Sequence, residues 1–396
     1  DMLVIDSCID LYGIPIDCQN IVLKNLIIDG NRENDPTIST DDLSLHNDDD
    51  RFSGLKLSNV LDSKLINITV QYTVNGEQVQ NTPAGGIFFT NGQTYISSQY
   101  PGCNNIFCKN INAHENDGTG IIIHNSTYIT IDSSFTSNNT GSGIGSQEAD
   151  YCNYYRITSE NNGHRSYPQD HGPFSNISIN GECSVAYDLT TSAATAAGLN
   201  IGHPNDPANA DFSIIKDVES FDNELDGIII RNSDYVQLSD LDLHSNIRNN
   251  LLIQNVVLGD DNNINPVYFD ASSVRIENSS IHGYYSDDSS FDVDGGYGIR
   301  IEGVSGYCDN FLTQSQASCI DSNSPNYGNW IDGSVEQWLD EECGKHIINN
   351  TAIYNNFYNG IGIINLEGEC LNSFNASVWI GDLVSLYNNG RADEFP

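Results

Sequence analysis

The stretch from Asn223 to Asn255, NELDGIIIRNSDYVQLSDLDLHSNIRNNLLIQN, contains one full period of a repeat. Asp226-Gly227 is typical of a turn, and the branched run that follows it, 228–230, predicts a short strand. An Asn-rich turn at 245–250 leads to a second apolar run, 251–253. Gly227 and Asn250 are 23 residues apart. Short strands that recur at a fixed spacing in the twenties, between Gly, Asn and Asp turns, predict a solenoid.

The same spacing recurs elsewhere in the chain. Gly120 and Gly143 are also 23 residues apart, and further coils begin near Gly198, Gly298 and Gly360. One coil cannot bury its apolar side alone, so coils must stack at about 4.8 Å. We therefore expect an all-β fold, a right-handed parallel β-helix of roughly a dozen coils with long surface loops between them. The alternative, a β-sandwich, would show hairpin turns every 8–12 residues and no such recurrence.

Alternation along each strand predicts which side chains face inward. The outer residues of each apolar triplet are expected to stack in the core, while the central residues, Ile122 and Ile229, are expected to point outward. Asn at the turns tolerates a left-handed backbone and can form ladders of side chains along the stack.

We expect residues 1–396 to form a single β-helix domain, either on its own or as a piece of a longer chain or assembly. The chain opens on strand-like sequence at Leu3–Ile5, without an amphipathic helix to cap the first coil. An uncapped solenoid end exposes unpaired backbone groups, and another chain can dock there. Self-association through the ends of the solenoid is therefore one expected kind of partnership.

The charge balance excludes one class of partner. The sequence has 54 acidic and 15 basic residues, which gives a net charge of −39. Nucleic acid is not an expected partner, because binding phosphates requires Lys and Arg. No stretch of 18 apolar residues is present, so no membrane insertion is expected.

Cysteines and glycosylation sequons suggest an extracellular or cell-surface location. The ten cysteines form an even set without zinc-binding spacing, which favours disulfides: Cys8, Cys18, Cys103, Cys108, Cys152, Cys183, Cys308, Cys319, Cys343 and Cys370. Three local pairs are plausible, although the sequence does not fix the connectivity: Cys8–Cys18, Cys103–Cys108 and Cys308–Cys319. Seven N-x-S/T sequons predict N-glycosylation sites: Asn67, Asn125, Asn138, Asn176, Asn278, Asn349 and Asn375.

The pattern resembles the pectate-lyase-like superfamily of right-handed parallel β-helices over most of the chain. The segments 20–34 (NIVLKNLIIDGNREN) and 217–228 (DVESFDNELDGI) are similar to coils of the catalytic modules of mannuronan C-5 epimerases. This resemblance implies the scaffold, and extracellular polysaccharide is one expected kind of partner. The family's Tyr-Gly-Phe-Asp-Pro-His motif is not present, because the corresponding place reads AGLNIGH at 197–203. Arg231 stands near the position where the resemblance implies an acid.

An outward polar strip is the candidate binding or catalytic surface. If coils align on their Gly or Asn starts, one column contains His124, Gln147, Gly202, Arg231, Gln254 and Glu302. The neighbouring column contains Asn125, Glu148, His203, Asn232, Asn255 and Gly303. Epimerases and lyases of polyuronates need a base and a cation that neutralises the carboxylate. His203 and Arg231 are the candidates for these two roles, while an ordinary solvated sheet face remains the alternative.

Calcium is a possible cofactor, because acidic groups recur in the polar segments. The candidate ligands are Asp287, Asp288, Asp292 and Asp294, and Asp48–Asp50 and Asp260-Asp261 are similar groups. None of these groups fits an EF-hand loop.

Two classes of function follow from these observations. The first is a secreted, disulfide-bonded glycoprotein with a structural or adhesive role at the cell exterior, as part of a fibre or surface assembly. The second is an epimerase or lyase that acts on acidic extracellular polysaccharide. The incomplete catalytic motif favours the first class, and the usual employment of the scaffold favours the second.

Overall fold

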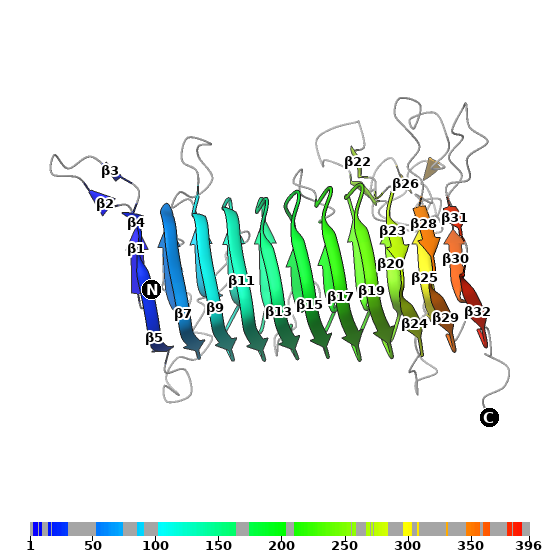
Figure 1. The fold of residues 1–396 in the computed structure, drawn as a ribbon, viewed down its shortest axis with the longest axis horizontal. Coiled ribbons are helices and arrows are strands. Elements are labelled where there is room, and N and C mark those ends of the chain that lie inside the picture. The colour runs from blue at the N-terminus through cyan, green and yellow to red at the C-terminus, as the bar shows by residue number, and fades with distance from the viewer. Residues whose placement is uncertain are drawn as a thin grey trace, which may run out of the picture.

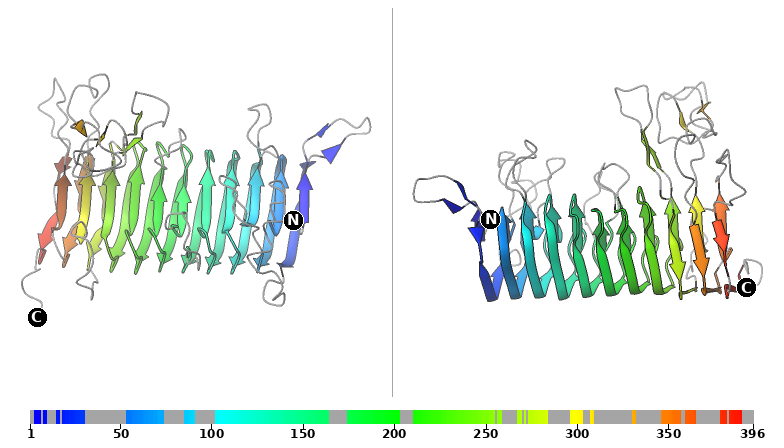
Figure 2. Two further views of the ribbon diagram at one scale, coloured as in Figure 1. Left: turned by 180° about the vertical axis from the view of Figure 1, so that it is seen from behind. Right: turned by 45° about the horizontal axis from the view of Figure 1, so that its top comes forward.

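A computed structural model of the chain shows a parallel β-helix (Figure 1). It describes residues 3–6, 8–9, 15–16, 18–30, 53–73, 85–90, 102–163, 174–202, 210–254, 256–258, 267–269, 271, 273–283, 296–302, 307–308, 330–331, 346–356, 359–364, 378–381 and 383–389. Two long parallel sheets run along the whole stack, and successive coils follow one another in chain order (Figures 1 and 2). The all-β class and the parallel β-helix are confirmed.

Among the described residues, one sheet has eleven strands. In spatial order they are β1 (Leu3–Asp6), β6 (Leu55–Ser58), β8 (Gly85–Thr90), β10 (Thr119–His124), β12 (Ile144–Gln147), β14 (Ile177–Ile179), β16 (Leu199–Ile201), β18 (Ile228–Arg231), β20 (Asn249–Gln254), β25 (Tyr297–Glu302) and β30 (Ile361–Ile364). We call it the eleven-stranded sheet.

The second sheet has fifteen strands in the described part of the chain. They are β4 (Cys18–Gln19), β5 (Val22–Asp29), β7 (Val60–Gln71), β9 (Asn104–His114), β11 (Thr127–Ser137), β13 (Asn153–Glu160), β15 (Val185–Ser192), β17 (Ile214–Phe221), β19 (Gln237–His244), β23 (Arg275–Glu277), β24 (Ser280–His282), β28 (His346–Asn349), β29 (Ala352–Tyr354), β31 (Val378–Ile380) and β32 (Ser385–Tyr387). Three antiparallel hairpins complete the described strands: β2 (Cys8–Ile9) with β3 (Pro15–Ile16), β21 (Val256–Leu258) with β22 (Val267–Phe269), and β26 (Tyr307–Cys308) with β27 (Trp330–Ile331).

The core lies between the two sheets. Ile121 pairs in register with Ile144, and Ile228 pairs with Leu251. These four side chains are at most 1% exposed, so the inward stacking expected from the sequence is confirmed. Full burial of each such side chain contributes about 1.5–3 kcal/mol. Because every coil adds its own inward residues, the core grows with each turn of the helix.

Buried asparagines form a ladder beside the core. The Asn116 amide donates from Nδ2 to Oδ1 of Asn139 at 2.9 Å, and Asn139 donates in the same way to Asn162 at 2.9 Å. All three side chains are fully buried. Asn139 also donates to the carbonyl oxygen of Ala113 at 3.0 Å. Each buried amide thus has partners in the coils on either side, as a buried polar group requires.

A second asparagine ladder is exposed and marks a bend in the long strands. Asn67 in β7 and Asn110 in β9 have left-handed backbones, with φ of 54° and 52°. Asn110 Nδ2 donates to Asn67 Oδ1 at 3.0 Å, and Asn67 Nδ2 donates to Asn25 Oδ1 at 2.8 Å. Asn is among the few side chains that tolerate this conformation, and this explains why the turns of the sequence are rich in it.

Four cysteines correct the sequence prediction of disulfides. Cys103, Cys108, Cys152 and Cys183 are free thiols, so the expected Cys103–Cys108 pair is wrong. Three of them, Cys103, Cys108 and Cys152, pack in the core as small apolar side chains. Burial raises the pKa of the Cys108 thiol far above its ordinary value, and it raises that of Cys152 to about 12.

The remaining cysteines differ in what the structure describes of them. Cys18 is disulfide-bonded. Cys8 and Cys308 lie in strands, while Cys319, Cys343 and Cys370 lie outside the described residues. Within the described ranges, no helix has the length and apolar character needed to cross a membrane.

Candidate functional site

The polar column predicted from the sequence exists on the outer face of the eleven-stranded sheet. His124 pairs in register with Gln147, Arg231 with Gln254, and Gln254 with Glu302. Gly202 lies next to Arg231 in the same column, since a Cβ atom on it would lie 1.9 Å from the Arg231 carbonyl oxygen. The strip runs from β10 to β25 and places side chains from distant parts of the sequence in one line.

The outer face beside this column is covered, which the sequence did not predict. Ile122 and Ile229 point away from the main core, as expected, but each is only 4% exposed. Ile229 and Leu252 form a second apolar cluster with Ala197. A plain solvated sheet face would leave these side chains open to water. The strip therefore lies beside an apolar floor with restricted access to solvent.

Arg231, Arg248 and Arg300 form a cluster of three arginines on this face. Arg231 Nε donates to Gln254 Oε1 at 2.9 Å, and Gln254 Nε2 donates to Glu302 Oε2 at 3.4 Å. Arg300 is 7% exposed, and its Nη2 lies 3.2 Å from Glu302 Oε1. Arg248 forms an ion pair with Asp226, with Nε 3.1 and 3.0 Å from the two carboxylate oxygens.

Among the described residues, the carboxylates that act on the charge of Arg231 are those of Asp226 and Glu302. Burial lowers the pKa of Arg231, and the positive charge of Arg248 lowers it further, while Asp226 and Glu302 oppose the shift. Positive charge is thus held close together and partly out of water. In a chain with a net charge of −39, this concentration requires an explanation, and an anionic ligand would relieve it.

The ring of Tyr297 completes the arrangement. The Arg300 Cζ atom lies 5.6 Å from its ring centroid. A Cβ atom on Gly362, one coil further, would lie 2.5 Å from the same ring. The missing side chain of Gly362 thus leaves room for the Tyr297 ring, which also contacts the Arg300 guanidinium.

The structure describes one member of the predicted catalytic pair. Arg231 lies in β18 as described above, while His203 lies outside the described residues. The other histidine of the strip, His124, is on β10, four strands away from β18 along the sheet. At about 4.8 Å per strand, this separation is roughly 19 Å. Among the described residues, the strip thus brings no imidazole to Arg231.

The sequence alone did not identify the other members of the cluster. Arg248 is in a turn, and Arg300 alternates with core residues in an apolar strand. Arg300 aligns with Leu252 in the register, so the pairing of strands would have been needed to place it. The 23-residue spacing in the sequence was enough to predict that Arg231 and Gln254 are neighbours in the column.

The predicted metal ligands are not among the residues that the structure describes. Asp287, Asp288, Asp292 and Asp294 lie outside them, as do 48–50 and 260–261. In the described part of the chain, no group of three or more His, Cys, Asp or Glu residues could hold a metal ion.

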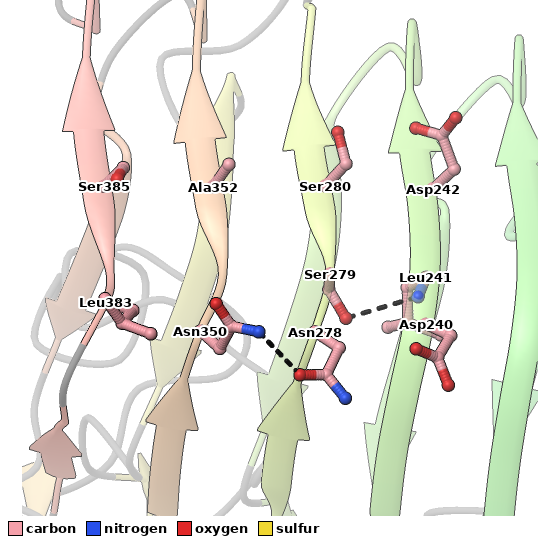
Figure 3. A pocket seen from close by; sticks show the side chains of 10 residues that line it. All are labelled: Asp240, Leu241, Asp242, Asn278, Ser279, Ser280, Asn350, Ala352, Leu383 and Ser385. Carbon is pink, nitrogen blue, oxygen red and sulfur yellow. Dashed lines mark hydrogen bonds between the residues drawn. The ribbon is translucent and has the colours of Figure 1, made fainter.

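The sequons occupy several environments. Asn176 is fully buried, and its Nδ2 donates to the Ser192 carbonyl oxygen at 2.7 Å, so a glycan there is incompatible with the fold. Asn278 lines a hollow of about 510 Å³ on the outer face of the fifteen-stranded sheet, and its Oδ1 accepts a bond from Asn350 Nδ2 at 2.7 Å (Figure 3). The other described sequon asparagines are Asn67, Asn125, Asn138 and Asn349, while Asn375 lies outside the described residues.

Comparison with known proteins identifies the fold. No protein-family model matches the chain, and no curated protein matches it. Among solved structures, the A-module of the Azotobacter vinelandii mannuronan C-5 epimerase AlgE6 matches with a TM-score of 0.51 and 13% identity, over 93% of this chain and 74% of that chain. The A-module of AlgE4 from the same organism gives 0.49 and 14%, over 92% and 74%. At 13% identity, the likeness to the AlgE6 module shows the fold alone, and it agrees with the two parallel sheets of the chain.

Proposed function

We propose that the protein is an extracellular β-helix that binds an acidic polysaccharide along the strip on its eleven-stranded sheet, in an adhesive or structural role. The observation that carries the proposal is the cluster of Arg231, Arg248 and Arg300 on one partly covered face of a strongly acidic chain. Guanidinium groups bind carboxylates in a bidentate manner, and the pairs are strongest where water is restricted. A uronate chain lying across the coils would present its carboxylates to this cluster.

The internal partners of the arginines support binding. Gln254 holds the Arg231 guanidinium in place, and Glu302 holds Arg300. A preformed site of this kind loses less side-chain entropy when a ligand binds. Tyr297 would contact the face of a sugar ring, while the arginines contact the acid groups.

The test compares oligomers of mannuronate and galacturonate with a neutral oligosaccharide of equal length by isothermal titration calorimetry. Arg231→Gln and Arg300→Gln should each weaken binding of the acidic oligomer by roughly tenfold or more, because a hydrogen bond to a charged group contributes about 1.5–3 kcal/mol. Lys216→Gln is the matched control, because it removes a positive charge from the fifteen-stranded sheet. Equal affinity in all variants, or equal binding of the neutral oligomer, would refute the proposal.

The second candidate function is C-5 epimerisation or lysis of the same polysaccharide. It is favoured by the position of Gly202 beside Arg231, since His203 is the next residue in the sequence. Arg231 would neutralise the uronate carboxylate, and His203 would accept the C-5 proton. Unsaturated ends or C-5 inversion, detected by ultraviolet absorbance and NMR and lost in His203→Ala, would establish this activity. Binding without turnover would leave the adhesive role.

A further inference from the structure

A row of exposed aromatic side chains follows the corner where each coil enters the fifteen-stranded sheet. Tyr128, Tyr151, Phe212 and Tyr235 occupy this row, together with Cys183, and we call the five residues the aromatic ridge. Backbone hydrogen bonds at 2.8–3.1 Å place the five residues in consecutive coils, in the order of the chain. The amide of each ridge residue before Tyr235 donates to the carbonyl oxygen of the residue that precedes the next ridge residue.

The ridge holds large side chains on left-handed corners and leaves their rings exposed. All five residues have left-handed backbones, with φ between 53° and 58°, which is unusual for a bulky side chain. The four rings are also 44–55% exposed. Left-handed corners recur along the whole stack, but exposed apolar rings in a single line are features of binding surfaces more than of ordinary packing.

The rings stack in two pairs, with one gap between the pairs. Tyr128 and Tyr151 have centroids 5.1 Å apart, and Phe212 and Tyr235 have centroids 5.0 Å apart, with planes within 10° and 4° of parallel. Cys183 occupies the coil between the pairs. Skipping one coil leaves roughly 10 Å between the rings of Tyr151 and Phe212, twice the spacing of neighbouring strands. That distance accommodates one further ring, at about 5 Å from each neighbour.

A row of carboxylates runs beside the ridge. The residues that precede the last four ridge positions are Asp150, Glu182, Asp211 and Asp234, which we call the acidic row. Asp150 Oδ1 accepts the amide of Glu182 at 2.8 Å, and Asp211 Oδ1 accepts the amide of Asp234 at 2.6 Å. Two of the four carboxylates are thereby held against the backbone next to the gap. Burial raises the pKa of the Cys183 thiol, as do the charges of Glu182, Asp150 and Asp211, so the floor of the gap is a neutral thiol.

We propose that the gap above Cys183 binds the ring of an amino sugar, stacked between Tyr151 and Phe212 and beside the carboxylates of the acidic row. The aromatic faces contact the C–H groups of the sugar and attract its ammonium group. The carboxylates accept hydrogen bonds from the ammonium and hydroxyl groups. A uronate is excluded, because its carboxylate would face the acidic row. The site is thus separate from the arginine strip, both in position and in the charge of its ligand.

The test is calorimetric titration with a glucosamine trimer at about 0.15 M salt, where long-range attraction to an acidic protein is largely screened. Cys183→Phe places a fifth ring in the gap and should weaken binding at least tenfold, while Cys183→Ser leaves the gap open and should bind as the natural chain does. Tyr151→Ala should also weaken binding. Circular dichroism of each variant establishes that it is folded.

Two controls separate this site from general charge attraction and from the arginine strip. Spermidine, which carries as many charges as the trimer, should not displace it. Arg231→Gln should leave trimer affinity unchanged. The proposal is overturned if the trimer does not bind the natural chain, if Cys183→Phe binds it equally well, or if spermidine displaces it.

Discussion

His346 gives the sharpest prediction about stability. The side chain is 4% exposed at the start of β28, where it aligns with Val378 of the next coil. The amide of Ile347 donates to the Val274 carbonyl oxygen, so Val274 is the neighbour of His346 in the preceding coil. The imidazole thus occupies a place in a column of valines. Burial lowers its pKa from 6.5 to about 4.

The consequence is a loss of stability in acid. Between pH 6.5 and pH 4 the unfolded chain binds the proton of His346 and the folded chain does not, so the free energy of unfolding falls as the pH falls. The full difference corresponds to about 3 kcal/mol, of which about 2 kcal/mol is lost between pH 7 and pH 5. His346→Val removes this dependence, and it also removes a buried polar group, so the variant should be more stable than the natural chain at pH 5.

Urea unfolding at pH 7 and pH 5, followed by circular dichroism, measures the effect. His346→Gln is the matched variant, because it stays polar but does not titrate: it should lose the pH dependence without gaining stability at pH 7. If His346→Val and the natural chain lose the same free energy between the two pH values, the explanation based on burial is wrong.

Three further predictions concern the coils and their thiols. Asn139→Ala breaks the buried asparagine ladder on both sides. It should lower the free energy of unfolding in urea by about 2–4 kcal/mol, because it leaves buried amide groups unpaired. Asn67→Ala, in the exposed ladder, should lower it by less than about 1 kcal/mol, and equal losses would contradict the distinction between the two ladders. Gly143→Ala places a Cβ atom 2.3 Å from Ser159 Oγ and should destabilise the chain by about 1–3 kcal/mol, whereas the Cβ atom of Gly145→Ala meets its nearest neighbour at 3.5 Å and should be tolerated. Cys152, whose pKa burial raises to about 12, should react with a thiol reagent at pH 8 only after unfolding, as mass spectrometry of the labelled peptides can show; labelling of Cys152 in the folded protein would refute its burial.

The repeat in the sequence predicted the fold because the same physical requirement acts on every coil. Ile121 and Ile144 recur at the same spacing because each must stack on the other, so position in the sequence translates directly into position in the core. The column of His124, Gln147, Arg231 and Gln254 followed from the same regularity.

What the sequence did not predict depends on contacts between coils at irregular spacing. Arg300 aligns with Leu252 across a spacing of 48 residues, about twice the 23-residue repeat, so the repeat did not place it. The free thiols were missed for a different reason: Cys108 is an inward residue of β9, and the prediction followed the even number of cysteines instead of this position. The two ring pairs of the aromatic ridge follow from left-handed corners, which hydrophobic periodicity does not reveal.

The direction of the hydrogen bonds between coils has a mechanical consequence. In both sheets these bonds lie along the axis of the stack, since each strand pairs with the strands of the coils before and after it. A force that pulls on the chain ends along the axis therefore unzips the stack. It breaks the hydrogen bonds of one outermost coil at a time and does not shear the bonds of all coils together. Each 23-residue coil, such as the one that separates Asn116 from Asn139, would release about 75 Å of chain. A filament built from such coils would yield in steps under tension and absorb work at each step.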